Sequence, residues 1–341
     1  MSAQIKRIGV IMIKRIGMLT SGGDCQAMNA AVRAVVLSAR KYNIEVVGIS
    51  DAYYGMTYNR PGDFRVLHAA DVENIINLGG TILNSARFTE FGDDPEYYAK
   101  LMGKNLEANG IGALVVIGGD GSFRGSLDIH KYTGIPCIGI PATIDNDIVS
   151  TEYTLGFDTA LRNTIEMCDA LRDTCNSHKR CNVVEVMGRN AGHLALYVGL
   201  ATGATAVLVP EKPVNFDSDV IDRIRQARLA GNTHFMIIVA EGAGSAIEIG
   251  KGIHEELGLD PRVTILGHIQ RGGTPSARDR VMASRMGYHA GKTLADGKTN
   301  RVICARAGQM VDIDITEGLS MKKGLNEQQY EVLQAMTGID N

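Results

Sequence analysis

Short apolar runs that end at Gly or Pro recur along this chain of 341 residues. Ala113–Ile117 leads into Gly118–Ser122 (GGDGS), and Pro136–Ile140 leads into Pro141–Asp147 (PATIDND). A short run of this kind, rich in β-branched residues, is typical of a strand buried on both faces of a parallel sheet. Comparable runs predict further strands at 13–19, 45–49, 181–187, 204–209, 235–240 and 302–305.

Helical patterns occupy the segments between these runs. They predict helices at 28–41, 71–78, 97–109, 122–131 and 156–175. Regular alternation of strands and helices indicates an α/β fold built on largely parallel sheets. No segment has the composition of a flexible linker, so two interleaved lobes are favoured over two separate domains. Residues 261–275 are predicted to be mostly loop.

Composition narrows the class of protein. The net charge is −3 and no long basic run is present, which argues against nucleic acid as the main partner. No apolar stretch reaches the roughly 20 residues that a membrane span needs, and no signal-peptide core is evident. We therefore expect a cytoplasmic protein without a membrane partner. The six cysteines contain no CxxC pair and no zinc spacing with histidine, so they are interpreted as reduced packing residues.

The N-terminus contains a near-repeat. Ile5–Val10 recurs almost unchanged as Ile13–Met18, and only the second copy leads directly into a Gly-rich loop. Residues 1–11 are therefore interpreted as an N-terminal extension, either an edge strand or a disordered tail.

Two Gly-rich loops follow predicted strands, at Thr20–Asp24 and at Gly118–Ser122. In open parallel sheets, ligands bind beyond the carboxyl ends of the strands. Backbone N–H groups at the start of the following helix are suited to phosphate oxygens. Asp120 is suited to Mg²⁺, which favours one or two carboxylates together with substrate phosphates. The Thr20–Asp24 loop alone is equally compatible with an ordinary turn, and a GGDG element alone is only moderately specific.

Acidic and basic side chains complete the pattern. Thr143–Asp147 supplies a hydroxyl and two carboxylates, one of which can accept a proton from an attacking hydroxyl group. Arginine offers a fixed fork of donors for phosphate oxygens, although any single arginine is more often a surface charge. The basic candidates in turn-like positions are Arg87, Arg180, Arg189, Arg262, His268 and Arg271. Together these features predict phosphoryl transfer, in which a protein mainly positions groups and neutralises charge.

The motifs, taken in order, resemble those of the 6-phosphofructokinase family in its compact bacterial, ATP-dependent form. The resemblance runs from Ile13 to the C-terminus. It is carried by Thr20–Asp24, Gly79–Thr81, Ser85–Phe88, Gly118–Ser122, Pro141–Asp147, Val184–Arg189 and Leu266–Gly273. It implies two interleaved Rossmann-like, three-layer lobes. The expected bounds are 12–156 and 270–320 for an ATP-binding lobe, and 157–269 and 321–341 for a fructose 6-phosphate-binding lobe.

The resemblance implies an enzyme of glycolysis, a kinase that transfers the γ-phosphoryl group of ATP to the 1-hydroxyl of fructose 6-phosphate with Mg²⁺. By position, the catalytic residues are expected to be Asp145 (general base), Asp147, Thr143, Arg87 and Arg189. The ATP and Mg²⁺ site would comprise Gly23, Tyr53, Arg87, Phe88, Gly119, Asp120, Gly121, Ser122 and Gly125. The sugar phosphate would be held by Thr143, Asp145, Met187, Arg189, Glu241, His268 and Arg271. Arg180 and Arg262 would reach the 6-phosphate in a neighbouring subunit, which implies a homo-oligomer, usually a tetramer.

The phosphoryl donor can be argued from two positions. Pyrophosphate-using members of the family carry Asp at the position of Gly121 and Lys at that of Ala142. Glycine leaves room for the α-phosphate of a nucleotide, so ATP is favoured. A pyrophosphate-dependent enzyme is one alternative. A non-catalytic paralogue that binds nucleotide or sugar phosphate is another, and it is disfavoured by the intact residues Asp120, Thr143, Asp145 and Asp147.

The family's effector site is only partly present. Arg33, Arg172 and Glu211 remain, but Leu37 and Asn232 stand where basic residues are expected, and the His68–Ala69 region lacks an arginine. Loss of several charge-assisted hydrogen bonds, worth about 1.5–3 kcal/mol each, weakens anion binding greatly. We therefore expect weak or altered allosteric control. Two further departures from the family pattern, Cys25–Ala27 and Gly92, lie near the expected nucleotide site.

Overall fold

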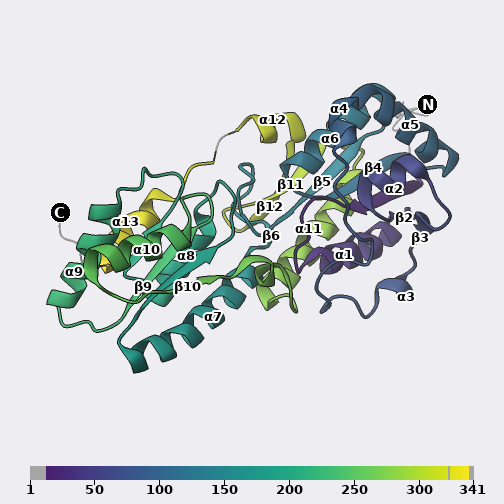
Figure 1. Ribbon diagram of the computed structural model, residues 1–341. Helices are drawn as coiled ribbons and strands as arrows, with labels where there is room; N and C mark the ends of the chain where they lie inside the picture. Colours follow the sequence, from purple (N-terminus) through teal and green to yellow (C-terminus); the bar gives the residue numbers. More distant parts are fainter. Residues whose placement is uncertain (1–12, 322, 338–341) are drawn as a thin grey trace, which may run out of the picture. The chain divides into compact units, whose positions relative to one another are not determined.

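The computed structural model describes residues 13–321 and 323–337 (Figure 1). These residues form two compact units, each treated by itself below. The first unit comprises 13–142, 148–155 and 277–321, and the second comprises 143–147, 156–276 and 323–337. Segments 143–147 and 270–276 belong to the second unit, whereas the expected lobe bounds placed them in the first. The proposed extension 1–11 lies outside the described residues.

The first unit contains the larger sheet. Its strand order is β12 (Gln309–Asp314), β11 (Arg301–Arg306), β5 (Cys137–Thr143), β4 (Ala113–Gly118), β1 (Arg15–Thr20), β2 (Glu45–Ile49) and β3 (Phe64–Val66), and the short β6 (Leu155–Gly156) pairs with β5. Only the outer pairs β11–β12 and β2–β3 are antiparallel among those whose register is given. The parallel centre aligns Met18 with Val115 and Val115 with Ile138.

Helices cover both faces of this sheet (Figure 1). They are α1 (Met28–Lys41), α2 (Ala52–Tyr58), α3 (Ala69–Val72), α4 (Glu90–Asp93), α5 (Pro95–Ala108), α6 (Asp120–Thr133), α11 (Ala277–Ala295) and α12 (Ile315–Ser320). Residues of α2, α5 and α6 share one apolar core with alternate residues of β2 and β4. Helices α1 and α11 pack closely, and Gly287 permits this contact: a Cβ added there would lie 2.5 Å from the Cβ of Ala34.

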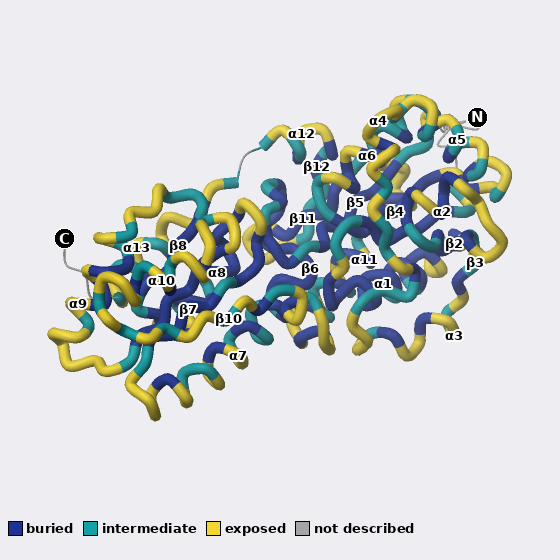
Figure 2. The backbone as a smooth tube through the Cα atoms, viewed as in Figure 1, coloured by how far each residue is buried: buried dark blue, intermediate teal, exposed yellow. Residues whose placement is uncertain are grey.

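The second unit contains a four-stranded parallel sheet. Its order is β10 (Arg262–Ile265), β7 (Cys181–Val186), β9 (Phe235–Ala240) and β8 (Ala206–Leu208). The helices are α7 (Phe157–His178), α8 (His193–Thr202), the π-helix η1 (Asp217–Ile221), α9 (Asp222–Leu229), α10 (Ala246–Leu257), the 3₁₀ helix η2 (Gly267–Arg271) and α13 (Glu327–Met336). Figure 2 shows β7 as buried and the ends of the surrounding helices as exposed. Buried residues of β7, β8 and β9 form the core of this unit together with residues of η1, α9 and α10.

The predicted α/β class with largely parallel sheets is confirmed, and the helix at 28–41 and the strands at 45–49 and 235–240 have the predicted bounds. Two predictions were wrong. Residues 71–78 do not form a helix, because only the single turn α3 is helical and the Asn29 side chain donates hydrogen bonds to the carbonyls of Leu78 and Gly79. Residues 261–275 contain β10 and η2. Among the described residues, none of the helices has the length and apolar character needed to cross a bilayer.

Candidate active site

The Gly118–Ser122 loop joins β4 to α6 in the first unit. A Cβ at Gly118 would lie 2.5 Å from the backbone oxygen of Ser21, so only glycine fits there. A Cβ at Gly119 or Gly121 would meet no atom within 4 Å. Gly119 is the extended N-cap residue of α6, and Asp120 lies in the first helical turn. The N–H groups at this helix start and the open space beside them form a site suited to an anion.

The loop at Thr20–Asp24 is held to a distant segment. The hydroxyls of Thr20 and Thr81 lie 2.8 Å apart, and the Ser85 hydroxyl donates to the Gly22 carbonyl at 2.6 Å. The Ser21 N–H donates to Ile117 at 2.9 Å, at the end of β4. These bonds bring both Gly-rich loops and the segment that leads to the exposed Arg87 into one region of the first unit.

Tyr53 supports the Gly118–Ser122 loop. Its hydroxyl donates to the carbonyl of Ser122 at 2.5 Å, and burial raises its pKa well above the ordinary value, so it stays a donor. A Cβ at Gly125 would lie 3.0 Å from Phe91 and 3.1 Å from Tyr53, which explains the glycine. Phe88 packs edge-on against Tyr98, with 4.9 Å between ring centroids. The predicted nucleotide residues Tyr53, Ser122 and Gly125 are therefore neighbours.

The Thr143–Asp147 loop belongs to the second unit and holds the predicted base. Asp145 is only 3% exposed, and its Oδ1 is buried with no hydrogen-bond partner among the described residues. Its Oδ2 lies 3.8 Å from Nε of Arg189. Burial, followed by repulsion from Asp147, raises the pKa of Asp145 from 3.8 to about 6, although Arg189 and Arg271 oppose the shift. A carboxylate with such a pKa is suited to general base catalysis near neutral pH.

A second loop in this unit carries Arg189. The Glu241 carboxylate accepts hydrogen bonds from the N–H groups of Gly188 at 3.2 Å and of Arg189 at 2.7 Å. Gly188 has a φ of +136°, and a Cβ there would lie 2.4 Å from the carbonyl oxygen of Ala191. Arg189 itself has a φ of +52°, a left-handed value that is uncommon for residues other than Gly, Asn, Asp and His. Glu241 therefore fixes an otherwise unfavourable turn.

The Leu266–Gly273 segment contributes a residue that sequence reasoning missed. Gln270 is 1% exposed, accepts a hydrogen bond from the Met187 N–H at 3.2 Å and donates to the Gly267 carbonyl at 2.9 Å. It thereby ties the predicted residue Met187 to the segment that carries His268 and Arg271. Nothing in the local sequence marks Gln270 as buried, and Met187 lies 83 residues away.

Arg180 and Arg262 lie apart from this cluster in the fold of the second unit. Arg180 immediately precedes β7, and Arg262 begins the edge strand β10. The Arg262 guanidinium lies 2.9 Å from the carboxylate of Asp260, and both side chains are more than half exposed. Their expected role in a neighbouring subunit stays a prediction.

The expected effector residues are divided between the units. Arg33 lies on α1, and its buried Nε has no hydrogen-bond partner among the described residues. Arg172 donates to the carbonyl of Thr202 in the second unit. Glu211 accepts hydrogen bonds from the Gly192 N–H at 2.9 and 3.1 Å, and thus stabilises the loop before α8.

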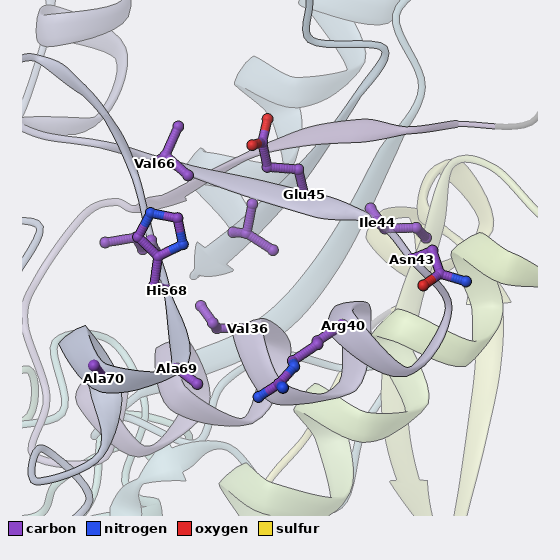
Figure 3. A pocket seen from close by; sticks show the side chains of 11 residues that line it. Val36, Arg40, Asn43, Ile44, Glu45, Val66, His68, Ala69 and Ala70 are labelled. Atoms are coloured by element: carbon purple, nitrogen blue, oxygen red, sulfur yellow. The ribbon is translucent and has the colours of Figure 1, made fainter.

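A cavity of about 590 Å³ lies in the first unit between the end of α1, β2 and the segment after β3 (Figure 3). Figure 3 shows the Arg40 and His68 side chains among its lining groups, with Val36 and Val66. Ala69, in the region where an effector arginine was expected, also lines it. None of the predicted catalytic residues lines this cavity.

The sequence is similar to those of known phosphofructokinases. The family described as Phosphofructokinase matches residues 15–294. ATP-dependent 6-phosphofructokinase of Bacillus cereus (strain B4264) is 49% identical over 320 residues, which cover 94% of this chain and 98% of that protein. The corresponding protein of Bacillus thuringiensis (strain Al Hakam) is 48% identical over the same coverage.

Solved structures share the fold. Phosphofructokinase from Saccharomyces cerevisiae superposes with a TM-score of 0.83 at 33% identity, over 95% of this chain and 46% of that one. Pyrophosphate-dependent phosphofructokinase from Marinobacter aquaeolei gives a TM-score of 0.80 at 22% identity, over 96% and 93%. The latter identity supports the shared fold alone.

Proposed function

The chain belongs to the phosphofructokinase family, and we propose that it is an ATP-dependent 6-phosphofructokinase that converts fructose 6-phosphate and ATP into fructose 1,6-bisphosphate and ADP. The observation that carries the mechanism is Asp145, a buried carboxylate with a pKa raised to about 6 and with Arg189 at 3.8 Å. Such a group is ionised at neutral pH yet still a competent proton acceptor.

In the proposed reaction, Asp145 takes the proton of the sugar 1-hydroxyl while that oxygen attacks the γ-phosphorus of ATP. The bond between this phosphorus and the bridging oxygen breaks, and ADP leaves. Arg189 neutralises charge on the transferred group, a role for which a guanidinium is suited. Asp147 raises the pKa of its neighbour by repulsion, and Thr143 accepts a hydrogen bond from the Asp145 N–H at 3.2 Å.

We assign the nucleotide to the Gly118–Ser122 loop and the start of α6. The open space around Gly119 and Gly121 supports this assignment, because phosphate oxygens can approach the backbone there. Asp120 in the first turn fits Mg²⁺, whose preferred donors are a few carboxylates with phosphate oxygens and water. Bound Mg²⁺ would neutralise charge on the β- and γ-phosphates.

ATP is the proposed donor because Gly121 is exposed and carries no side chain that would obstruct an α-phosphate. Pyrophosphate is the runner-up donor. The position that bears lysine in pyrophosphate-using relatives is Ala142, which is 1% exposed and has no charge to offer.

We further propose a homo-oligomer, consistent with a tetramer, that works in the cytoplasm. Its support is the edge strand β10, where Val263 is 37% and Ile265 52% exposed, next to Ile269 at 57%. An unpaired edge with exposed apolar side chains is suited to contact with another copy of the chain. Light scattering of the purified protein tests this, and a monomer at micromolar concentration would contradict it.

The deciding experiment measures fructose 1,6-bisphosphate formation with Mg²⁺ and fructose 6-phosphate, with ATP or pyrophosphate in parallel. Activity with ATP alone is expected. Activity with pyrophosphate would contradict the Gly121 argument, and no activity with either donor would favour a binding-only relative.

A further inference from the structure

Lys323, in the C-terminal segment of the chain, contacts the Thr143–Asp147 loop, which is called the catalytic loop below. Its Nζ donates a hydrogen bond to the carbonyl oxygen of Asn146 at 2.5 Å, across a sequence separation of 177 residues. Asn146 stands between Asp145 and Asp147 and has a φ of +49°, in the left-handed region that Asn tolerates better than most residues. The carbonyl that Lys323 holds is therefore in the turn that sets the directions of both carboxylates.

Lys323 also lies close enough to His193 to act on its charge. His193, 4% exposed, is the first residue of α8 and directly follows the loop that carries Arg189. Burial and then the positive charge of Lys323 lower the pKa of His193 to about 4, so its ring is neutral at pH 7. No second positive charge from His193 opposes the ammonium group at that pH.

The catalytic loop needs such a contact because its base is poorly anchored. Oδ1 of Asp145 has no hydrogen-bond partner among the described residues, and the Arg189 side chain that faces Oδ2 is 55% exposed. The Asp145–Thr143 hydrogen bond lies within the loop itself. A charge-assisted bond to the Asn146 carbonyl fixes the loop to the rest of the second unit and is stronger than a neutral one.

We propose that Lys323 is a positioning residue for the phosphoryl-transfer step: by holding the Asn146 carbonyl it aligns Asp145 with the sugar hydroxyl. This inference rests on the proposed function. It assigns Lys323 no contact with either substrate, so its effect falls on turnover and not on substrate affinity.

The test compares Lys323→Met, which keeps the length of the side chain but removes the donor, with Lys323→Arg, which restores a donor. A matched control is Lys212→Met, because the Lys212 Nζ binds the Glu327 carboxylate at 2.9 and 3.0 Å and so anchors α13 of the same C-terminal segment. We measure kcat, the KM for each substrate and Tm for all three variants and the full-length parent.

Misplacement of a catalytic group by about 1 Å can cost about 10²-fold, so Lys323→Met is expected to lower kcat about 10- to 100-fold with little change in either KM. Lys323→Arg should recover most of this loss, and Lys212→Met should retain the parent kcat. Unchanged kcat in Lys323→Met overturns the proposal, as does a parallel loss of kcat in Lys212→Met at a similar Tm. If Lys323→Met does not fold, Lys323→Ala, which also removes the donor, takes its place: a low kcat with unchanged Tm in Lys323→Ala supports the proposal, and parent-like kcat there overturns it. An inactive parent protein would instead refute the proposed function.

Discussion

The Gly118–Ser122 loop and the Thr143–Asp147 loop follow neighbouring strands, β4 and β5, but they depend on different features of their residues. The first loop is defined by missing side chains: Gly118 avoids a backbone clash, and Gly119 and Gly121 leave open space. The second is defined by a buried carboxylate at 3% exposure with a raised pKa. One loop is therefore sensitive to added atoms and the other to lost charge, and the two sensitivities can be separated by experiment.

The largest effect is expected at the second loop. Asp145→Asn should reduce kcat by about 10²–10⁴-fold, the usual range for loss of a general base, with the KM for ATP little changed. Steady-state kinetics at saturating ATP check this. Parent-like turnover would remove Asp145 from its assigned role.

The same variant should be more stable than the parent at pH 8. The pKa of Asp145 is about 6 in the folded protein against an ordinary 3.8, so the folded state binds the proton more tightly. The free energy of unfolding therefore falls as pH rises from about 4 to about 6, while this group ionises. Asp145→Asn removes that cost, and its gain in Tm should vanish below about pH 4. An equal Tm difference at pH 4 and pH 8 would contradict the burial argument.

The first loop should respond in the reverse way. Gly121→Asp adds a side chain where no atom lies within 4 Å, in the first turn of α6, so Tm should hold or rise slightly. The new carboxylate would repel phosphate, and loss of one charge-assisted contact of about 1.5–3 kcal/mol corresponds to a rise of about 10- to 100-fold in the KM for ATP. Gly121→Ala is the control, with an expected change of only a few-fold.

If Gly121→Ala and Gly121→Asp raise the KM for ATP equally, the space at this position and not its charge controls the donor. If neither changes the KM, the nucleotide does not approach α6 at Gly121, and the assignment of the donor site is wrong.

Elements that depend on a local sequence pattern could be predicted, and those without such a pattern could not. Strands β2 and β9 and helix α1 were predicted with their observed bounds, because periodicity is a local property of the chain. Helix α8 was missed because its sequence, HLALYVGLAT, is apolar on nearly every face and gives no 3.6-residue stripe. Helix α10 was not predicted either, although Ser245 marks its start: the Ser245 side chain caps the helix by accepting a hydrogen bond from the Glu248 N–H.

The residues of the candidate site differ in the same way, between those in local motifs and those with distant partners. Asp145 and Gly121 could be identified from motifs in which all the informative residues are adjacent. Gln270 and Lys323 could not, because their partners Met187 and Asn146 are 83 and 177 residues away. Such contacts depend on the assembled sheet and on the C-terminal segment, and no local pattern encodes them.

A smaller effect is expected from pH alone. Asp145 accepts a proton only when it is ionised, and with a pKa of about 6 most of it is ionised at pH 7. Below pH 6 the active fraction falls about tenfold per pH unit, so kcat/KM for fructose 6-phosphate should drop about tenfold between pH 7 and pH 5. A rate profile over this range, with Tm followed in parallel, checks the prediction. A profile that is flat down to pH 5 would mean that the base has an ordinary pKa.

The smallest effect is expected from allosteric effectors, outside both loops. Arg172 donates a hydrogen bond to the Thr202 carbonyl, and Glu211 accepts one from the Gly192 N–H, so both already have protein partners. Ala69, in the region where a further arginine was expected, brings no charge to the cavity it lines. With several charge-assisted bonds of about 1.5–3 kcal/mol missing, phosphoenolpyruvate or ADP at millimolar concentration should shift half-saturation by fructose 6-phosphate no more than about threefold. Rate measurements against each effector test this. Strong sigmoidal inhibition at submillimolar phosphoenolpyruvate would mean that other basic groups, such as Arg40 and His68 at the cavity, replace the missing ones, and Arg40→Met should then abolish that inhibition.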